Sequence, residues 1–157
     1  MKKVILNTII FLGINFLYAQ SNIKMKDIKL EDNVIYYMGA KQFIIEDRML
    51  MTEVFIKDTN NAETIITMVI RKAPAPEGVT QYNKDGMDTY YEFTYVPTNY
   101  KCDYRPGLGK KSIAKDMLYY GIFENGIVNE DNVNKFINLK GAPYTARNNK
   151  TTIIIHN

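Results

Sequence analysis

The sequence predicts an α+β domain in which an antiparallel β-meander is covered on one face by one or two C-terminal helices. Three observations support this single-domain fold. Between residues 34 and 72, short runs rich in Ile, Val, Phe, Thr and Met are separated by polar groups of turn length. Between residues 88 and 96 the chain alternates with a period of two, which places Tyr91, Phe93 and Tyr95 on one face. In the last third, apolar residues take helical spacing between capping residues.

Four strands are predicted in the first half of the chain, over residues 34–38, 42–46, 49–57 and 64–71. The fourth segment allows two interpretations. Its apolar residues also have helical spacing, and Asn60 with Glu63 would form a capping pair at a helix start. Nearly all of its residues are β-branched, however, which disfavours a helix and suits a pleated surface. We therefore predict a strand, with a helix as the alternative.

A loop and a hairpin are predicted in the middle of the chain. Regular structure is expected to stop at residues 73–78, because the prolines there lack amide donors and restrict the residues before them. Further on, Asp85-Gly86 is typical of a hairpin turn. The sequence therefore predicts that residues 80–83 and 87–91 pair across this turn.

A helix and a tight hairpin are predicted next. Ser112 is expected to cap a helix over residues 113–120, which Gly121 closes. Asn125-Gly126 suits the positive backbone dihedrals of a primed turn, so residues 122–128 are predicted to form a hairpin.

The second helix has clearer start and stop signals. Asn129 is its predicted cap, and the two acidic residues that follow complement the positive end of the helix dipole. Gly141 is expected to end it. Residues 151–156 are predicted to form a terminal strand.

The first twenty residues have the three parts of a secretory signal peptide: two lysines, an apolar run shorter than a membrane span, and a small residue, Ala19, at the expected cut. Residues 1–20 are predicted to be removed, leaving residues 21–157 as one soluble domain with no further membrane span, secreted or periplasmic. Loss of Lys2 and Lys3 with the leader lowers the formal net charge from +3 to +1. A near-neutral domain gives no general attraction to nucleic acid, so none is expected as a partner.

The chain has one histidine and one cysteine. Because His156 stands beside the C-terminus, multi-histidine metal sites and a Ser-His-Asp triad in a central cleft are not expected, and no cofactor is indicated. Cys102 has one cationic and one anionic neighbour, which gives no reason for a lowered pKa. We expect a half-buried thiol; a bond between two chains is the alternative.

Residues 81–92 resemble a calcium loop in part. Asn83, Asp85, Gly86 and Glu92 take the third, fifth, sixth and twelfth positions of that pattern. Its first position holds glutamine instead of a carboxylate, and prolines and a strand flank it instead of helices. A hairpin turn is the preferred interpretation, and a calcium-stabilised module is an alternative.

Ser112 and Lys115 have the S-x-x-K spacing with which penicillin-binding enzymes activate a serine nucleophile. The chain is similar to that family in this tetrapeptide alone, since no S-x-N motif follows. Ser112 as a helix cap is the preferred interpretation, and a small hydrolase is an alternative. The glycine-rich basic loop at residues 105–112 departs from the Walker pattern at two positions and is expected to be solvated or to bind an anion weakly.

Six tyrosines lie between residues 82 and 104, and some of their rings are expected to be partly exposed on the sheet. Tyrosine combines apolar area with a hydroxyl, which suits recognition of a protein or an envelope glycan. The candidate binding residues are Tyr91, Tyr95, Tyr104 and Arg105. The sequence thus favours an exported, non-catalytic binding domain over an enzyme, although half-buried packing explains tyrosines in strands equally well.

Overall fold

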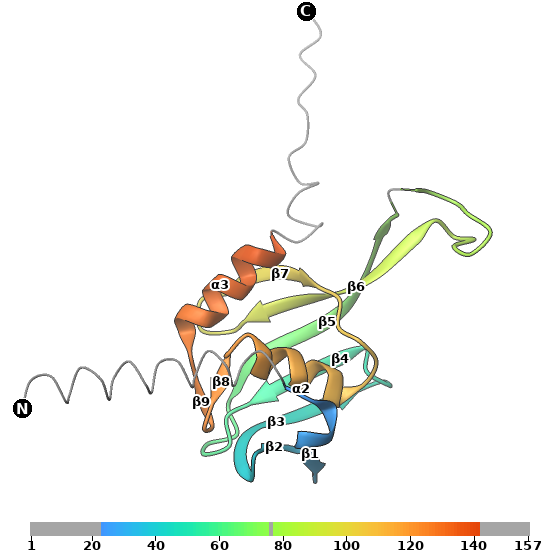
Figure 1. Ribbon diagram of the computed structural model, residues 1–157. Coiled ribbons are helices and arrows are strands. Elements are labelled where there is room, and N and C mark those ends of the chain that lie inside the picture. Colours follow the sequence, from blue (N-terminus) through green and yellow to red (C-terminus); the bar gives the residue numbers. More distant parts are fainter. Residues whose placement is uncertain (1–22, 76, 142–157) are drawn as a thin grey trace, which may run out of the picture.

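The computed structural model describes residues 23–75 and 77–141, and Figure 1 shows their arrangement. Seven strands form one antiparallel sheet whose spatial order follows the chain, so the predicted meander and the α+β class are confirmed. These strands are β1 (Ile28–Glu31), β2 (Val34–Tyr37), β3 (Ala40–Arg48), β4 (Glu53–Lys57), β5 (Thr64–Pro74), β6 (Met87–Tyr95) and β7 (Tyr100–Tyr104). The remaining elements are the 3-10 turn η1 (Met25–Asp27), the helices α2 (Lys110–Tyr119) and α3 (Glu130–Lys140), and the two-stranded sheet of β8 (Phe123–Glu124) and β9 (Ile127–Val128).

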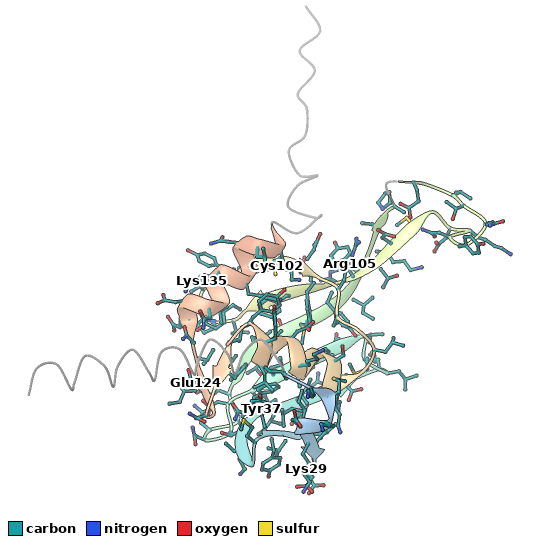
Figure 2. All side chains as sticks on the ribbon, viewed as in Figure 1. Lys29, Tyr37, Cys102, Arg105, Glu124 and Lys135 are labelled. Atoms are coloured by element: carbon teal, nitrogen blue, oxygen red, sulfur yellow. The ribbon has the colours of Figure 1, made fainter. Side chains whose placement is uncertain are left out.

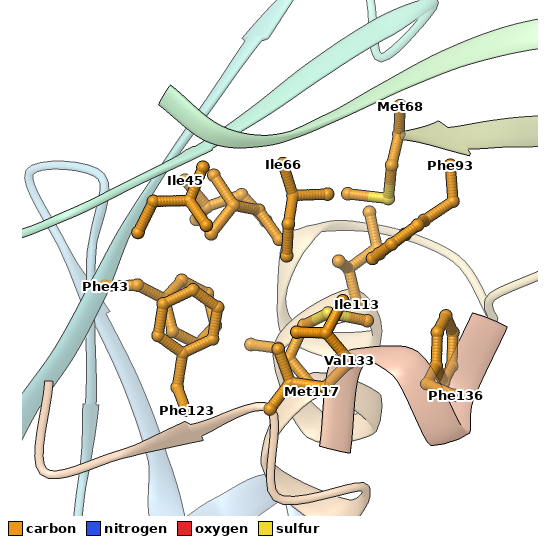
Figure 3. Close-up of a cluster of buried hydrophobic side chains, with 14 of the residues drawn as sticks. Phe43, Ile45, Ile66, Met68, Phe93, Ile113, Met117, Phe123, Val133 and Phe136 are labelled. Atoms are coloured by element: carbon orange, nitrogen blue, oxygen red, sulfur yellow. The ribbon is translucent and has the colours of Figure 1, made fainter. Parts of the chain in front are cut away.

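The core lies between one face of the sheet and the two helices. Cross-strand partners such as Ile45 and Ile56, or Met68 and Phe93, place their side chains on this face. Figure 3 shows Ile45, Met68 and Phe93 on the same side as side chains from α2, α3 and β8. Phe136 of α3 is the centre of an aromatic group, with ring centroids 5.1 Å from Phe93, 5.5 Å from Tyr104 and 5.0 Å from Tyr120.

The contested segment, residues 64–71, is a strand, which confirms the preferred interpretation. The predicted loop at residues 73–78 starts too early, because β5 continues to Pro74 and pairs there with Met87. Residues 80–83 form no strand, so the predicted hairpin has the wrong first arm. β4 pairs with β5 only as far as Val69, so Pro74 lies where β5 has no neighbour on that side. A missing amide donor is tolerated at such an edge. Beyond that point β5 and β6 project from the body as a two-stranded arm (Figure 1).

The first helix begins earlier than predicted. Gly109, with φ of 81°, is the residue before α2, and its carbonyl accepts hydrogen bonds from the amides of Ser112 and Ile113 at 3.0 and 3.4 Å. Ser112 therefore lies in the first turn and is not the cap. The predicted strand 49–57 is also too long, because residues 49–52 form a turn and β4 starts at Glu53. β1 and β7 were not predicted.

Other local signals hold. Asn129 caps α3 by accepting a hydrogen bond from the Asn132 amide at 3.1 Å, and Gly141 ends the helix. Asn125 and Gly126 have φ of 52° and 82°, as a primed turn requires. The predicted signal peptide and the predicted strand at residues 151–156 lie outside the described residues.

Cys102 is fully buried in β7, where we had expected a half-buried thiol. Burial raises its pKa to about 12, and the nearby Asp103 carboxylate adds to the effect. The thiol is thus protonated and shielded, and a disulfide to a second chain would need the sheet to open.

We predict that Cys102 in the folded protein resists alkylation by iodoacetamide at pH 8.5 and becomes fully reactive in urea, because only the exposed thiolate is nucleophilic. Mass spectrometry of samples quenched over time measures the rate. A native rate within about tenfold of the unfolded rate would show that the thiol is accessible.

Candidate functional site

A cavity of about 480 Å³ lies at the N-terminal end of α2. We call it the turn cavity. Three segments far apart in the sequence surround it: the turn at residues 49–52, the adjoining ends of β6 and β7, and the loop at residues 105–109. Its walls are mainly apolar, with Ile70 and Ile113 among them.

The turn between β3 and β4 has an unusual backbone. Met49, Leu50 and Met51 all have positive φ, at 48°, 54° and 70°. Each non-glycine residue in this left-handed conformation costs about 1–2 kcal/mol. Such strain persists only where the surrounding contacts enforce it.

Several hydrogen bonds hold the turn, and two of them involve the left-handed residues directly. The Tyr91 hydroxyl donates a hydrogen bond to the Met51 carbonyl at 2.6 Å, and the Thr52 amide donates to the Met49 carbonyl at 3.3 Å. Burial, and secondarily the Asp47 carboxylate, raises the pKa of Tyr91, so this hydroxyl stays a donor to higher pH than that of an exposed tyrosine. Tyr91 thus stabilises the turn.

The first residue of α2 fixes the helix against the sheet. Lys110 Nζ lies 2.6 Å from Asp47 Oδ1 and donates a hydrogen bond to Asn33 Oδ1 at 2.9 Å. This hydrogen bond from Lys110 lowers the pKa of Asp47. The ion pair joins the end of β3, next to the turn, to the start of α2, so these two borders of the turn cavity are tied together.

Two leucines form an exposed apolar rim. Leu50 is 97% exposed and Leu108 is 100% exposed, and both line the turn cavity. Neither leucine is among the binding residues that the sequence predicts. Leu50 falls within a predicted strand, 49–57. The Gly107-Leu108-Gly109 pattern, in contrast, carries a usable signal for an exposed contact residue, because a large apolar residue between two glycines in a basic loop has no packing role.

Three of the four candidate binding residues gather at this cavity. Tyr91, Tyr104 and Arg105 line it, whereas Tyr95 lies elsewhere, with its hydroxyl bonded to Glu130 at 3.1 Å. Arg105 is exposed and pairs with Asp88 at 3.1 Å.

The candidate tyrosines lie on the helix-covered face of the sheet. Tyr95 and Tyr104 are each 1% exposed, so their rings serve the core and offer a partner almost no surface. Tyr104 donates a hydrogen bond to Asp116 of α2 at 2.9 Å, and burial raises its pKa strongly. Burial, with the hydrogen bond to Glu130, raises the pKa of Tyr95 to about 12. Tyr82 and Tyr100 are the exposed rings of this segment.

The hydrolase and calcium alternatives gain no support from the described residues. Ser112 and Lys115 lie one turn apart on α2, but neither lines the turn cavity, which Ile113 borders instead. Asn83 and Asp85 use their side-chain oxygens to accept from the Met87 amide at 3.2 Å each, as in a polar turn.

The third calcium ligand of that pattern is far along β6. Glu92 stands between Arg71 and Lys101, at 3.6 and 3.5 Å. In residues 23–75 and 77–141 no group of three or more His, Cys, Asp or Glu side chains is placed to hold a metal ion.

Comparison of the chain with family models, with curated proteins and with solved structures finds no match. In the part of the chain that the structure describes, none of the helices has the length and apolar character needed to cross a membrane. Function is therefore inferred from the geometry of the turn cavity.

We predict that Tyr91→Phe lowers the free energy of unfolding by about 1 kcal/mol, because it removes one hydrogen bond from a strained turn. Urea unfolding measures this change. Tyr100→Phe is the matched control, since Tyr100 is exposed at the sheet edge and the substitution should be neutral. Equal effects of the two substitutions would contradict a supporting role for the Tyr91 hydroxyl.

Proposed function

We propose that this protein is an exported, non-catalytic domain that binds another protein, with the turn cavity receiving an apolar side chain of that partner. The proposal retains the binding role expected from the sequence and centres the contact on the cavity beside Tyr91 and Arg105. Exposed tyrosine rings are not its basis, because Tyr95 and Tyr104 are buried.

One observation carries the proposal. A turn of three consecutive left-handed, non-glycine residues holds Leu50 almost fully in solvent at the rim of a cavity whose rim also includes the exposed Leu108. Both the strain and the exposed apolar area cost stability, and the almost fully exposed side chains of Leu50 and Leu108 add no packing to the core. A partner that covers the rim would bury this apolar surface, and that burial would contribute to the binding free energy.

The polar groups around the cavity support binding over catalysis. The Tyr91 hydroxyl is bonded to a backbone carbonyl, the Tyr104 hydroxyl to Asp116, and Arg105 to Asp88. These bonds have structural roles, and they leave the walls of the cavity apolar.

A protein is favoured over an envelope glycan by the chemistry of the rim. Sugar rings stack on exposed aromatic faces, whereas Leu50 and Leu108 offer branched aliphatic surface of the kind that packs against apolar side chains. A glycan partner is the alternative that the binding experiment distinguishes.

We predict that Leu50→Asn weakens partner binding without loss of stability. Asparagine tolerates the left-handed conformation better than leucine, so the free energy of unfolding should stay equal or rise by up to about 1 kcal/mol. Phage-displayed peptides selected on residues 21–157 should be rich in apolar residues and bind Leu50→Asn at least about tenfold more weakly, since an apolar anchor is worth a factor of this size.

Leu139→Asn is the matched control, because Leu139 is an exposed leucine on α3 away from the cavity, and it should bind the peptides like the wild type. A glycan array is probed in parallel. Peptides that bind wild type and Leu50→Asn equally, or array binding without peptide binding, would refute the proposed site.

Export makes a separate prediction. Expression of the full chain in a bacterial host should yield a product in the periplasm or medium that begins after Ala19 or Gln20. N-terminal mass spectrometry of cell fractions checks this. An intact N-terminus in the cytosol would contradict export.

A further inference from the structure

A second cavity, of about 250 Å³, lies at the opposite end of α2 from the turn cavity. We call it the bulge cavity. Its apolar walls include Tyr37, Leu118 and Phe123. Gln42, Glu124 and Asn125 are polar residues of its lining, and Figure 2 shows the positions of Tyr37 and Glu124.

A β-bulge explains why a glutamine lies in the core. Ile35 pairs with Phe43 and the next residue, Tyr36, pairs with Lys41, so Gln42 is an extra residue in β3. A bulge redirects the side chain of its extra residue, and bulges are common beside binding sites. Gln42 is thereby only 3% exposed, next to Phe43, whose ring centroid lies 4.6 Å from that of Phe123.

The amide of Gln42 is incompletely satisfied. Its Nε2 donates a hydrogen bond to the Ala40 carbonyl at 3.3 Å, which gives the donor side of the amide a partner. Among the described residues Oε1 has no hydrogen-bond partner. A buried acceptor without a donor lowers stability, and a leucine of similar size would fill the same space without this cost. The position is therefore better explained by a ligand than by folding.

We propose that the bulge cavity binds a small apolar molecule that carries one amine, with an N–H donated to Gln42 Oε1. The charge of the lining favours a cationic ligand over an anionic one. Glu124 contributes an exposed carboxylate, and no lysine or arginine is among the described residues that line the cavity. The volume equals that of about eight water molecules, which matches one aromatic ring with a two-carbon chain. This ligand site is independent of the protein-binding role proposed for the turn cavity.

The experiment uses three probes of nearly equal size and shape on residues 21–157: 2-phenylethylamine, 2-phenylethanol and ethylbenzene. Amide chemical shifts in two-dimensional NMR report binding and place it at residues of the cavity such as Phe123 and Gly121. The amine should bind most tightly, and ethylbenzene, which has no donor, about tenfold more weakly, as expected for one hydrogen bond to a buried acceptor. The alcohol should fall between them.

Two variants assign the polar contacts. Gln42→Leu should reduce amine affinity about tenfold, leave ethylbenzene affinity unchanged, and raise the thermal midpoint. Glu124→Gln should weaken the amine about threefold and leave the neutral alcohol unaffected, with the difference lost at high salt. Gln81→Leu, at an exposed glutamine on the arm, is the matched control and should change none of these values.

The amine is added up to about 10 mM, which exceeds a weak dissociation constant of about 1 mM. Absence of saturable shifts at that concentration would overturn the proposal, as would equal affinity of all three probes for the wild type. Lower stability of Gln42→Leu with unchanged amine affinity would also overturn it. The probe comparison on the wild type decides the question even where a variant does not fold.

Discussion

The apolar face of a seven-stranded sheet must be covered, and this chain covers it with two short helices. α2 has ten residues and is therefore about 15 Å long. Gly109 and Ile113 at its start line the turn cavity, whereas Leu118 and Gly121 at its end line the bulge cavity. The two candidate sites are thus the places where α2 stops covering the sheet. Their positions follow from helix length, and their chemistry follows from the residues that the sheet presents there.

The tyrosines of β6 and β7 show how the helices and the turn are held on this face. Each ring packs on the core side of the sheet, and each hydroxyl reaches a different element: Tyr91 bonds to the turn, Tyr95 to Glu130 of α3, and Tyr104 to Asp116 of α2. The high tyrosine content therefore has a structural explanation at these three positions. A tyrosine can fill apolar space and still satisfy a polar partner at its tip, which suits the junction of two layers.

The sequence was informative where local rules decide the structure and uninformative where distant contacts do. Alternation, caps and the Asn125-Gly126 turn predicted most strands, the hairpin of β8 and β9, and both helices. The bulge at Gln42 depends on the register between β2 and β3, which no local pattern encodes. The turn at Leu50 depends on the hydroxyl of Tyr91, about forty residues later. Tyr100, Cys102 and Tyr104 do alternate, so β7 was predictable in principle.

The same contrast supports the functional argument. Over most of the described chain, local preference and tertiary structure agree, as with the cap at Asn129. Departures from local preference include the left-handed turn that exposes Leu50 and the buried amide of Gln42. Both lie beside cavities at the ends of α2, where the packing requirements of the core are weakest. A departure that destabilises the fold and that core packing does not require is best explained by binding, because a bound partner or ligand would satisfy what the fold leaves unsatisfied.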